Sequence, residues 1–498
     1  MRVETEALTE LKAVLREIDD LRRAAAVLAW DQETNMPPGG ITARARHLST
    51  LARLAHERLT AEATGELLDE AERATADLPF DSDDRSLVRV AKRDRDLAVK
   101  LPSSLVAELV QASSSARPVW VKARADDDWS TFAPAFERIV GLQRQAADAL
   151  GWEDRRYDAL LNRSEPGLKT ADLERLFADL KEAVVPLLYE LAQRPSDDSP
   201  LLTGIEPERQ TSFAYDVCKG LGFEAERGRQ DLSAHPFCTS FSPGDVRFTT
   251  RTTDGFGHTV YSSIHETGHG LYNQGIAEAL DGTPLGYGST SGFHESQSRL
   301  WENLVGRSRA FAEWLTPRLR REFPEHFAQL QPETWYQAVN SVKPGLIRVN
   351  ADEVSYNLHI LLRFELENLI LDGDLDIEAV PEAWNARMRE YLGIEPPTVA
   401  EGPLQDIHWS GFSFGGFPSY TLGNVIGAQL LEVIRRDLPD LDGQIAQGEF
   451  APLLEWLRDR VYRHGRKFTP KELLERITGE GLSARAWIAY IQGKFATA

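Results

Sequence analysis

The hexapeptide Ile264-His265-Glu266-Thr267-Gly268-His269 predicts a helix with a metal ion bound on one face. Two histidines at positions i and i+4 of a helix project their imidazoles from the same side, where both can bind one ion. Glu266 follows the first histidine and would lie beside that ion. A divalent metal acidifies water and polarises a carbonyl, and a nearby carboxylate can accept the proton that the water loses. This spacing is typical of enzymes that hydrolyse peptide bonds.

The residues around the hexapeptide fit a helix that packs closely against its neighbours. Val260 and Ile264 give it an apolar side, whereas Gly268 and Gly270 each cost about 1 kcal/mol relative to alanine in a helix interior. Glycines in such a helix predict that neighbouring structure crowds against it. A buried structural helix that contains the motif by chance is the alternative, because 11 histidines occur among 498 residues.

A third metal ligand is expected beyond this helix, since a catalytic zinc site usually has three protein ligands and one open position. Glu295, in the segment Gly292–Gln297, lies 26 residues after His269, which leaves room for a loop and a returning helix. Its neighbour His294 is the alternative ligand, and only one of the two can face the metal from a helix. We favour Glu295, with zinc as the predicted metal and cobalt as its alternative.

Two later segments contain donors that can stabilise the oxyanion of a tetrahedral intermediate. They are His408, within Gly402–Trp409, and Tyr420, within Phe417–Tyr420. Both segments are rich in glycine and proline, as site loops often are. Capped turns and packing aromatics are the alternative interpretation of the same residues.

Arg348 is the candidate that would distinguish a chain terminus from an internal peptide bond. Its planar guanidinium matches both oxygens of a free carboxylate. An ordinary ion pair with Asp352 or Glu353 is the alternative, and Arg247 and Arg251 are competing candidates.

The composition excludes several classes of partner. With 56 basic and 77 acidic residues, the formal net charge is -21 at pH 7, so phosphate backbones and anionic membranes would be repelled. The N-terminus lacks the pattern of a signal peptide, and no run of about 18 apolar residues occurs. Only Cys218 and Cys238 are present, which predicts a reducing, cytoplasmic location. A thiol–imidazole pair of Cys238 and His235 is a weaker alternative for the chemistry, because no orienting third group is evident.

Hydrophobic periodicity predicts a mainly helical fold. Thr- and aromatic-rich segments at residues 237–241, 246–251 and 258–261 predict a small antiparallel sheet that leads into the metal helix. Residues 194–210 are rich in Pro, Ser and Asp and predict a long surface connection. The clearest helical segments are residues 8–21, 48–59, 173–191, 358–369 and 425–434.

Together, these segments resemble the carboxypeptidase Taq family of zinc metallocarboxypeptidases. The likeness begins at Trp30 and continues to Asn424 and beyond. Six short motifs in the family's order are far more specific than any one of them. They are His235–Phe237, Asp245–Thr249, His265–His269, His294–Gln297, Ile347–Asp352 and Gly402–Trp409.

The resemblance implies a large, two-lobed helical metallopeptidase fold with a deep groove, akin to thimet oligopeptidase and angiotensin-converting enzyme. Residues 1–498 would form one catalytic unit. Residues 1–193 would contribute helices to the groove wall, and residues 211–498 would bind metal and substrate. A homodimer is also implied.

The resemblance implies a role for each site residue. The metal ligands would be His265, His269 and Glu295, with Glu266 as the general base.

The remaining roles concern peptide substrates with a free C-terminus. Arg348 would bind the C-terminal carboxylate, and His408 and Tyr420 would lie near the scissile carbonyl. The stretches around His235 and Arg247 would close one end of the groove and limit the enzyme to trimming chain ends.

Two other functions share these sequence features. An oligopeptidase or endopeptidase would use the same zinc chemistry in an open groove. A non-catalytic helical peptide-binding protein is the second alternative, and an intact Glu266 argues against it.

Overall fold

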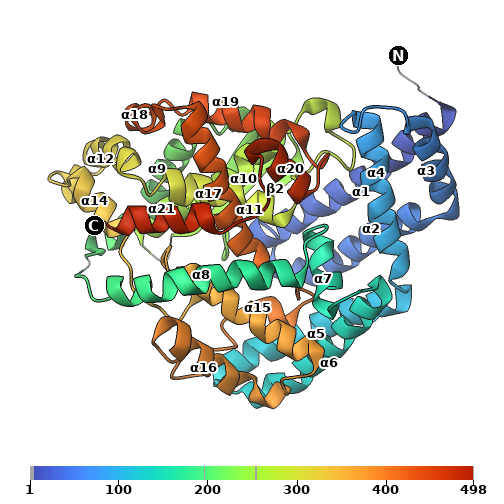
Figure 1. Cartoon of the computed structure of the whole chain (residues 1–498), viewed down its shortest axis with the longest axis horizontal. Coiled ribbons are helices and arrows are strands. Elements are labelled where there is room, and N and C mark those ends of the chain that lie inside the picture. Colours follow the sequence, from blue (N-terminus) through green and yellow to red (C-terminus); the bar gives the residue numbers. More distant parts are fainter. Residues whose placement is uncertain (1–4, 196, 253–254, 497–498) are drawn as a thin grey trace. The chain divides into compact units, whose positions relative to one another are not determined.

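The computed structural model describes residues 5–195, 197–252 and 255–496, and most of them are helical (Figure 1). The predicted mainly helical fold is therefore confirmed. The chain forms two compact units, each assembled from three separate segments. Unit 1 contains Met1–Val99, Asp198–Val339 and Gly427–Gly481, and unit 2 contains Lys100–Asp197, Asn340–Ile426 and Leu482–Ala498.

Unit 1 carries the N-terminal helices, the sheet and the histidine helix. Its longer helices are α1 (Glu6–Thr34), α2 (Ile41–Thr60), α3 (Glu62–Thr75), α4 (Asp83–Lys100), α9 (Pro207–Gly220), α10 (Phe256–Gly275), α11 (Ser291–Arg299), α12 (Arg309–Glu322), α14 (Pro332–Val339), α18 (Leu441–Gln447), α19 (Ala451–Arg460) and α20 (Pro470–Thr478).

Unit 2 contains the segments of Arg348 and His408 together with a set of longer helices. They are α5 (Ser103–Asp126), α6 (Trp129–Leu150), α7 (Arg156–Ser164), α8 (Thr170–Leu191), α15 (Tyr356–Asp372), α16 (Val380–Leu392) and α21 (Arg485–Ala496). Helix α17 (Pro418–Asp437) begins in unit 2 and ends in unit 1.

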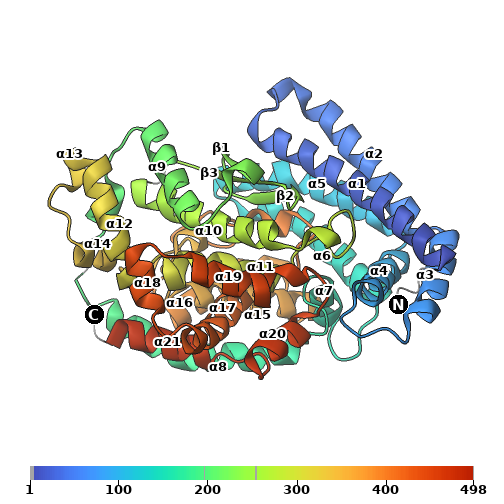
Figure 2. The same cartoon turned by 90° about the horizontal axis from the view of Figure 1, so that it is seen from above.

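The apolar periodicity of the N-terminal segment corresponds to a buried helix face. Leu8, Leu11, Leu15 and Ile18 of α1 are almost fully buried and belong to a core shared with α2, α3 and α4. Helices α1 and α2 lie side by side (Figure 2), joined through a short turn that includes Pro38–Gly40. Burial of such a stripe stabilises each helix more than its intrinsic propensity does.

The predicted sheet exists, but its pairing is mixed. Strand β3 (Asp245–Thr250) lies centrally, antiparallel to β2 (Cys238–Ser242) and parallel to β1 (Gly228–Leu232). The antiparallel prediction is confirmed for β2 and β3. Strand β1, which pairs parallel to β3, was missed because its sequence GRQDL has a single apolar residue and gives no strand pattern.

The strand predicted at residues 258–261 is wrong, because these residues lie in α10. Thr259, Val260 and Tyr261 are buried there, and the Thr259 hydroxyl donates a hydrogen bond to the Gln210 side chain at 2.8 Å. Burial on nearly every side outweighs the strand propensity of β-branched residues. Strand β3 packs against this helix (Figure 2). Within the described part of the chain, no helix is long and apolar enough to cross a membrane.

Candidate metal centre

Gly268 allows α11 to approach α10 at the metal motif. A Cβ atom at Gly268 would lie 2.6 Å from both the Gln297 carbonyl oxygen and the Ser298 Cα. Such a distance is much shorter than van der Waals contact, so any larger residue would push α11 away. The close approach predicted from this glycine is therefore present, and it brings Glu295 of α11 to the histidines of α10.

His265, His269 and Glu295 place their ligand atoms together. One nitrogen from each histidine and one carboxylate oxygen all lie within 4.8 Å of one another. The Glu295 Oε2 lies 3.7 Å from Nε2 of His265 and 3.4 Å from Nε2 of His269. Two imidazoles and a carboxylate are the donor set that catalytic zinc prefers, so these residues fit the predicted divalent metal.

Charged neighbours hold Glu295 in its ionised form. Burial raises the pKa of Glu295, but Arg299, His265 and His269 outweigh burial and leave this pKa well below its usual range. The Arg299 Nε donates a hydrogen bond to Glu295 Oε1 at 2.8 Å, which leaves Oε2 turned toward the histidines. An ionised carboxylate is the form that binds a metal.

His294, the alternative ligand, contacts the ring nitrogen of His269 that does not face Glu295. Its Nδ1 lies 2.7 Å from Nδ1 of His269, whereas His269 presents Nε2 to Glu295. Burial and, to a smaller extent, the His269 charge lower the pKa of His294 to about 3. Of these two neighbours, Glu295 is the one whose ligand atom lies close to those of His265 and His269.

Glu302 is a residue of this centre that the sequence analysis missed. Its Oε2 lies 2.8 Å from Nδ1 of His265, and its Oε1 accepts a hydrogen bond from Arg307 at 3.0 Å. Burial opposes ionisation, but His265 and Arg299 hold the pKa of Glu302 well below its usual range. Its spacing of seven residues from Glu295, about two helical turns, is the signal that places both on one side.

Glu266 is buried beside the same groups. Only 7% of its surface is exposed. Burial raises its pKa above the usual value, the charges of His265 and His269 lower it, and Glu295 is among the charges that raise it. A carboxylate so placed has the chemistry of a general base.

The thiol–imidazole alternative does not fit the structure. Burial raises the pKa of Cys238 well above its usual value, so the thiol stays protonated, and the Glu266 charge raises it further. Asn273 lies 3.9 Å from its sulfur, whereas His235 is exposed. Nucleophilic catalysis requires the thiolate.

Arg247 is engaged by its own strand and by aromatic rings. Its guanidinium donates two hydrogen bonds of 2.8 Å to the Asp245 carboxylate and stacks over Trp30 and Phe241 at 4.4 and 4.9 Å. The competing candidate Arg251 donates to the Ala234 carbonyl at 3.4 Å. Trp30 belongs to α1, so Arg247 ties that helix to the sheet.

In unit 2, Arg348 is buried and paired with Asp406. Its Nε and Nη2 donate to Asp406 Oδ1 at 3.1 and 2.9 Å, and its Nη1 donates to the Tyr356 hydroxyl at 3.1 Å. Burial lowers the pKa of Arg348, but Asp406 outweighs burial and raises it. The alternative ion pairs with Asp352 and Glu353 are wrong.

Those two acidic residues have other partners in unit 2. Asp352 accepts hydrogen bonds from the backbone of Val354 and Ser355 at 2.9 and 3.0 Å, and Glu353 pairs with Lys494 at 2.6 Å. Asp406 in turn binds a second buried arginine, Arg363, whose pKa burial lowers to about 10.

The two predicted oxyanion donors lie beside this pair. His408 Nε2 is 3.4 Å from the Tyr420 hydroxyl, and His408 Nδ1 is 3.8 Å from Asp406. The Arg348 guanidinium lies 5.0 Å from the centre of the Tyr420 ring. Unit 2 thus brings together Arg348, His408 and Tyr420, although they come from three separate stretches of the chain.

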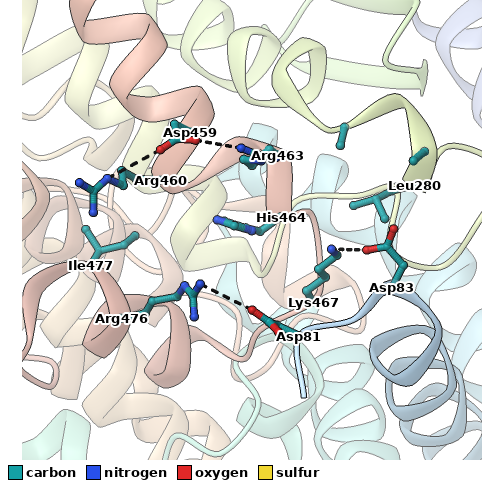
Figure 3. A pocket seen from close by; sticks show the side chains of 12 residues that line it. Asp81, Asp83, Leu280, Asp459, Arg460, Arg463, His464, Lys467, Arg476 and Ile477 are labelled. Carbon is teal, nitrogen blue, oxygen red and sulfur yellow. Dashed lines mark hydrogen bonds and ion pairs between the residues drawn. The ribbon is translucent and has the colours of Figure 1, made fainter. Parts of the chain in front are cut away.

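A separate cavity of about 740 Å³ in unit 1 is lined by charged residues of other segments (Figure 3). Its cations are already matched by carboxylates, because Arg463 lies 2.9 Å from Asp459 and Lys467 pairs with Asp83. None of the three candidate ligands lines this cavity. The metal centre is therefore a different site.

Comparison with known proteins identifies the family of this chain. Residues 10–495 match the carboxypeptidase Taq (M32) metallopeptidase family. The chain is 42% identical to thermostable carboxypeptidase 1 of Thermus thermophilus, over 97% of this chain and 96% of the relative. It is 38% identical to thermostable carboxypeptidase 1 of Pyrococcus furiosus, over 99% of each chain.

A solved structure gives the same result. The M32 carboxypeptidase from Deinococcus radiodurans R1 superposes with a TM-score of 0.95 at 40% identity, over 99% of each chain. The chain belongs to the carboxypeptidase Taq (M32) family of metallopeptidases, as the motifs indicated. It is a metallocarboxypeptidase, a hydrolase of peptide bonds.

Proposed function

We propose that His265, His269 and Glu295 bind one divalent metal ion, and that the enzyme releases single C-terminal amino acids from peptides with broad specificity. The observation that carries the proposal is the convergence of these three ligand atoms within 4.8 Å, with the buried Glu266 beside them. Zinc is the proposed metal because two imidazoles and one carboxylate suit it, and cobalt is the alternative.

Glu266 acts as the general base and then as the general acid. Bound metal supplies a Lewis acid that acidifies water and polarises the scissile carbonyl. The Glu266 carboxylate accepts the proton of the attacking water and delivers it to the nitrogen of the leaving amine. His408 and Tyr420 donate hydrogen bonds to the carbonyl oxygen as negative charge develops on it.

Arg348 binds the free carboxylate of the substrate. Among the hydrogen bonds of the described residues, Asp406 and Tyr356 take three of its N–H groups. Because a guanidinium has five, one N–H remains on each terminal nitrogen, and this pair matches the two oxygens of a carboxylate. Asp406 keeps the guanidinium from rotating, so recognition needs little further ordering.

The walls around His235 and Arg247 restrict the enzyme to chain ends. The Asp245 pair and the two stacked rings hold Arg247 rigidly, which suits a wall better than a mobile binding group. We also propose that residues 1–498 work as one catalytic unit, in which residues 1–193 contribute helices to the groove wall and residues 211–498 bind metal and substrate.

A homodimer in the cytoplasm completes the proposal. The family resemblance supports the dimer, and the use of only two cysteines supports a reducing compartment. The high net negative charge argues against nucleic acid or an anionic membrane as a partner.

Digestion of an N-terminally blocked peptide tests the proposed reaction. Mass spectrometry of the products, with and without a chelator, should show a ladder shortened by one C-terminal residue at a time, and only in the absence of chelator. Internal fragments would favour an oligopeptidase. Zinc binding without hydrolysis of any peptide would favour a non-catalytic peptide-binding protein.

A further inference from the structure

We propose that His294 and Glu302 are positioning residues for the metal-binding histidines. Each accepts the Nδ1 proton of one imidazole, so that both imidazoles present Nε2 to the ion. The inference rests on the proposed metal site and goes beyond it, because it names the residue that determines the tautomer of each metal-binding histidine.

Glu302 determines the tautomer of His265. Both of its oxygens already accept hydrogen bonds from arginines, so the 2.8 Å contact with Nδ1 is a hydrogen bond from the imidazole N–H to the carboxylate. The lone pair of a neutral His265 is then on Nε2, the nitrogen that lies 3.7 Å from Glu295. A carboxylate behind a ligating histidine fixes its ring and increases its basicity.

Two arginines hold Glu302 in place. Arg307 donates to one carboxylate oxygen at 3.0 Å, and Arg299 donates to the other at 3.3 Å. Arg299 also donates to Glu295 at 2.8 Å, so one guanidinium binds both the candidate ligand Glu295 and the positioning residue Glu302.

A π-helical turn shapes the backbone at Glu302. It covers Leu300–Val305, directly after α11, and the Gly306 N–H donates to the Trp301 carbonyl at 2.9 Å. A Cβ atom at Gly306 would lie only 2.7 Å from the Glu302 carbonyl oxygen, so glycine is required there. Turns of this kind occur often at functional sites, where they redirect one side chain.

His294 determines the tautomer of His269 in a different way. The two Nδ1 atoms are 2.7 Å apart, so one must donate and the other accept. His269 must keep the lone pair of Nε2 for the metal, so its Nδ1–H donates to His294. The His294 proton is then on Nε2, which lies 3.4 Å from the Asn273 side-chain oxygen, an acceptor.

The two positioning residues differ in charge, so their loss should weaken metal binding to different extents. Glu302 is an anion and donates electron density through its hydrogen bond, whereas a neutral His294 only orients its partner. Loss of Glu302 should therefore weaken metal binding more than loss of His294. His294 also stacks on Tyr272 at 5.0 Å, so a test must separate positioning from packing.

Zinc affinity of the full-length apoprotein is the readout that packing alone would not change. Competition with a chromophoric chelator gives the dissociation constant, and thermal unfolding of the same apoprotein reports its packing. Glu302→Ala should weaken zinc binding roughly 10- to 100-fold, and Glu302→Gln about tenfold. His294→Phe, which keeps an aromatic ring against Tyr272, should weaken it about tenfold, and His294→Gln should stay within about threefold because its amide oxygen accepts the Nδ1 proton.

Two variants serve as controls for these changes. Glu365→Gln removes a carboxylate that is paired with Arg387 in unit 2, and His464→Gln removes a histidine outside the metal centre. Both should bind zinc as the unmodified enzyme does.

The outcomes are distinct. Unchanged zinc affinity in Glu302→Gln and His294→Phe overturns the positioning roles, even if the unfolding temperature of the apoprotein falls. Failure of the unmodified enzyme to bind zinc would instead overturn the metal site on which the inference rests.

Discussion

The metal centre of unit 1 and the arginine cluster of unit 2 carry opposite charge imbalances. In the first, the carboxylates of Glu266, Glu295 and Glu302 outnumber the guanidiniums of Arg299 and Arg307. This excess of negative charge fits a divalent cation. Buried charges are costly unless they are compensated, so such a cluster indicates what it binds.

In the arginine cluster, two guanidiniums meet one carboxylate. Arg348 and Arg363 share Asp406, which leaves one positive charge in a buried setting. A peptide C-terminus would neutralise it. In our proposal, the metal and the substrate carboxylate each carry the sign of charge that one cluster lacks.

Metal removal should have the largest effect and tests the negatively charged cluster. Dialysis against a chelator should abolish peptide hydrolysis, and addition of zinc should restore it, because three protein ligands without the ion supply no Lewis acid. Turnover measured before and after zinc addition checks this. Full activity in a preparation shown to be metal-free would contradict the proposed chemistry.

Glu266→Gln should lower kcat roughly 10²- to 10⁴-fold, the usual contribution of a general base. Zinc content and unfolding temperature should stay near those of the unmodified enzyme, because Glu266 is not one of the three candidate ligands. Steady-state kinetics with metal analysis checks both. The control is Glu365→Gln, and substantial remaining turnover in Glu266→Gln would refute the assigned base.

Arg348→Ala tests the positively charged cluster. It should lower kcat/KM roughly 10- to 100-fold for peptides with a free C-terminus, because a charge-assisted hydrogen bond contributes about 1.5–3 kcal/mol. Zinc affinity should not change. Kinetics on matched free and amidated peptides separates the effects, and an equal loss on both would remove the proposed role of Arg348.

Gly268→Ala should destabilise the protein by about 1–3 kcal/mol, the usual cost of an overpacked contact. The added Cβ atom meets the Gln297 carbonyl and the Ser298 backbone at 2.6 Å, neither of which can rotate away. Chemical denaturation measures the change. Gly493→Ala on α21, where no heavy atom lies within 4 Å of the added Cβ, is the control and should be neutral or stabilising.

Glu367→Gln should change the pH dependence of stability. Burial raises the pKa of Glu367 to about 7, although Gly415, Tyr157 and Trp409 donate hydrogen bonds to it. A pKa raised by folding means that stability is lost as pH rises through about 7.

The unmodified enzyme should therefore lose about 2 kcal/mol relative to the Gln variant between about pH 5 and 7. Unfolding free energies at several pH values check the slope. Parallel curves for the two proteins would show that this carboxyl is not responsible.

Much of the metal centre could be predicted from sequence because helical spacing is local. Residues four positions apart on α10 must share a face, so His265 and His269 needed no tertiary information. Gly268 is also a local signal, because a glycine inside a helix predicts a closely packed neighbour. Glu302 was missed because its spacing of seven residues from Glu295 is common among helical glutamates, and the residue pattern does not signal the π-helical turn that carries it.

The sequence by itself determined the helical class, the two histidines with Glu266, and the six motifs that resemble one family. Only the tertiary structure decided the parallel pairing of β1 with β3, the inclusion of residues 258–261 in α10, and Asp406 as the partner of Arg348. The physical reason is range: periodicity and helical spacing act within a few residues, whereas strand pairing, burial and ion pairing join residues that only the folded chain brings together.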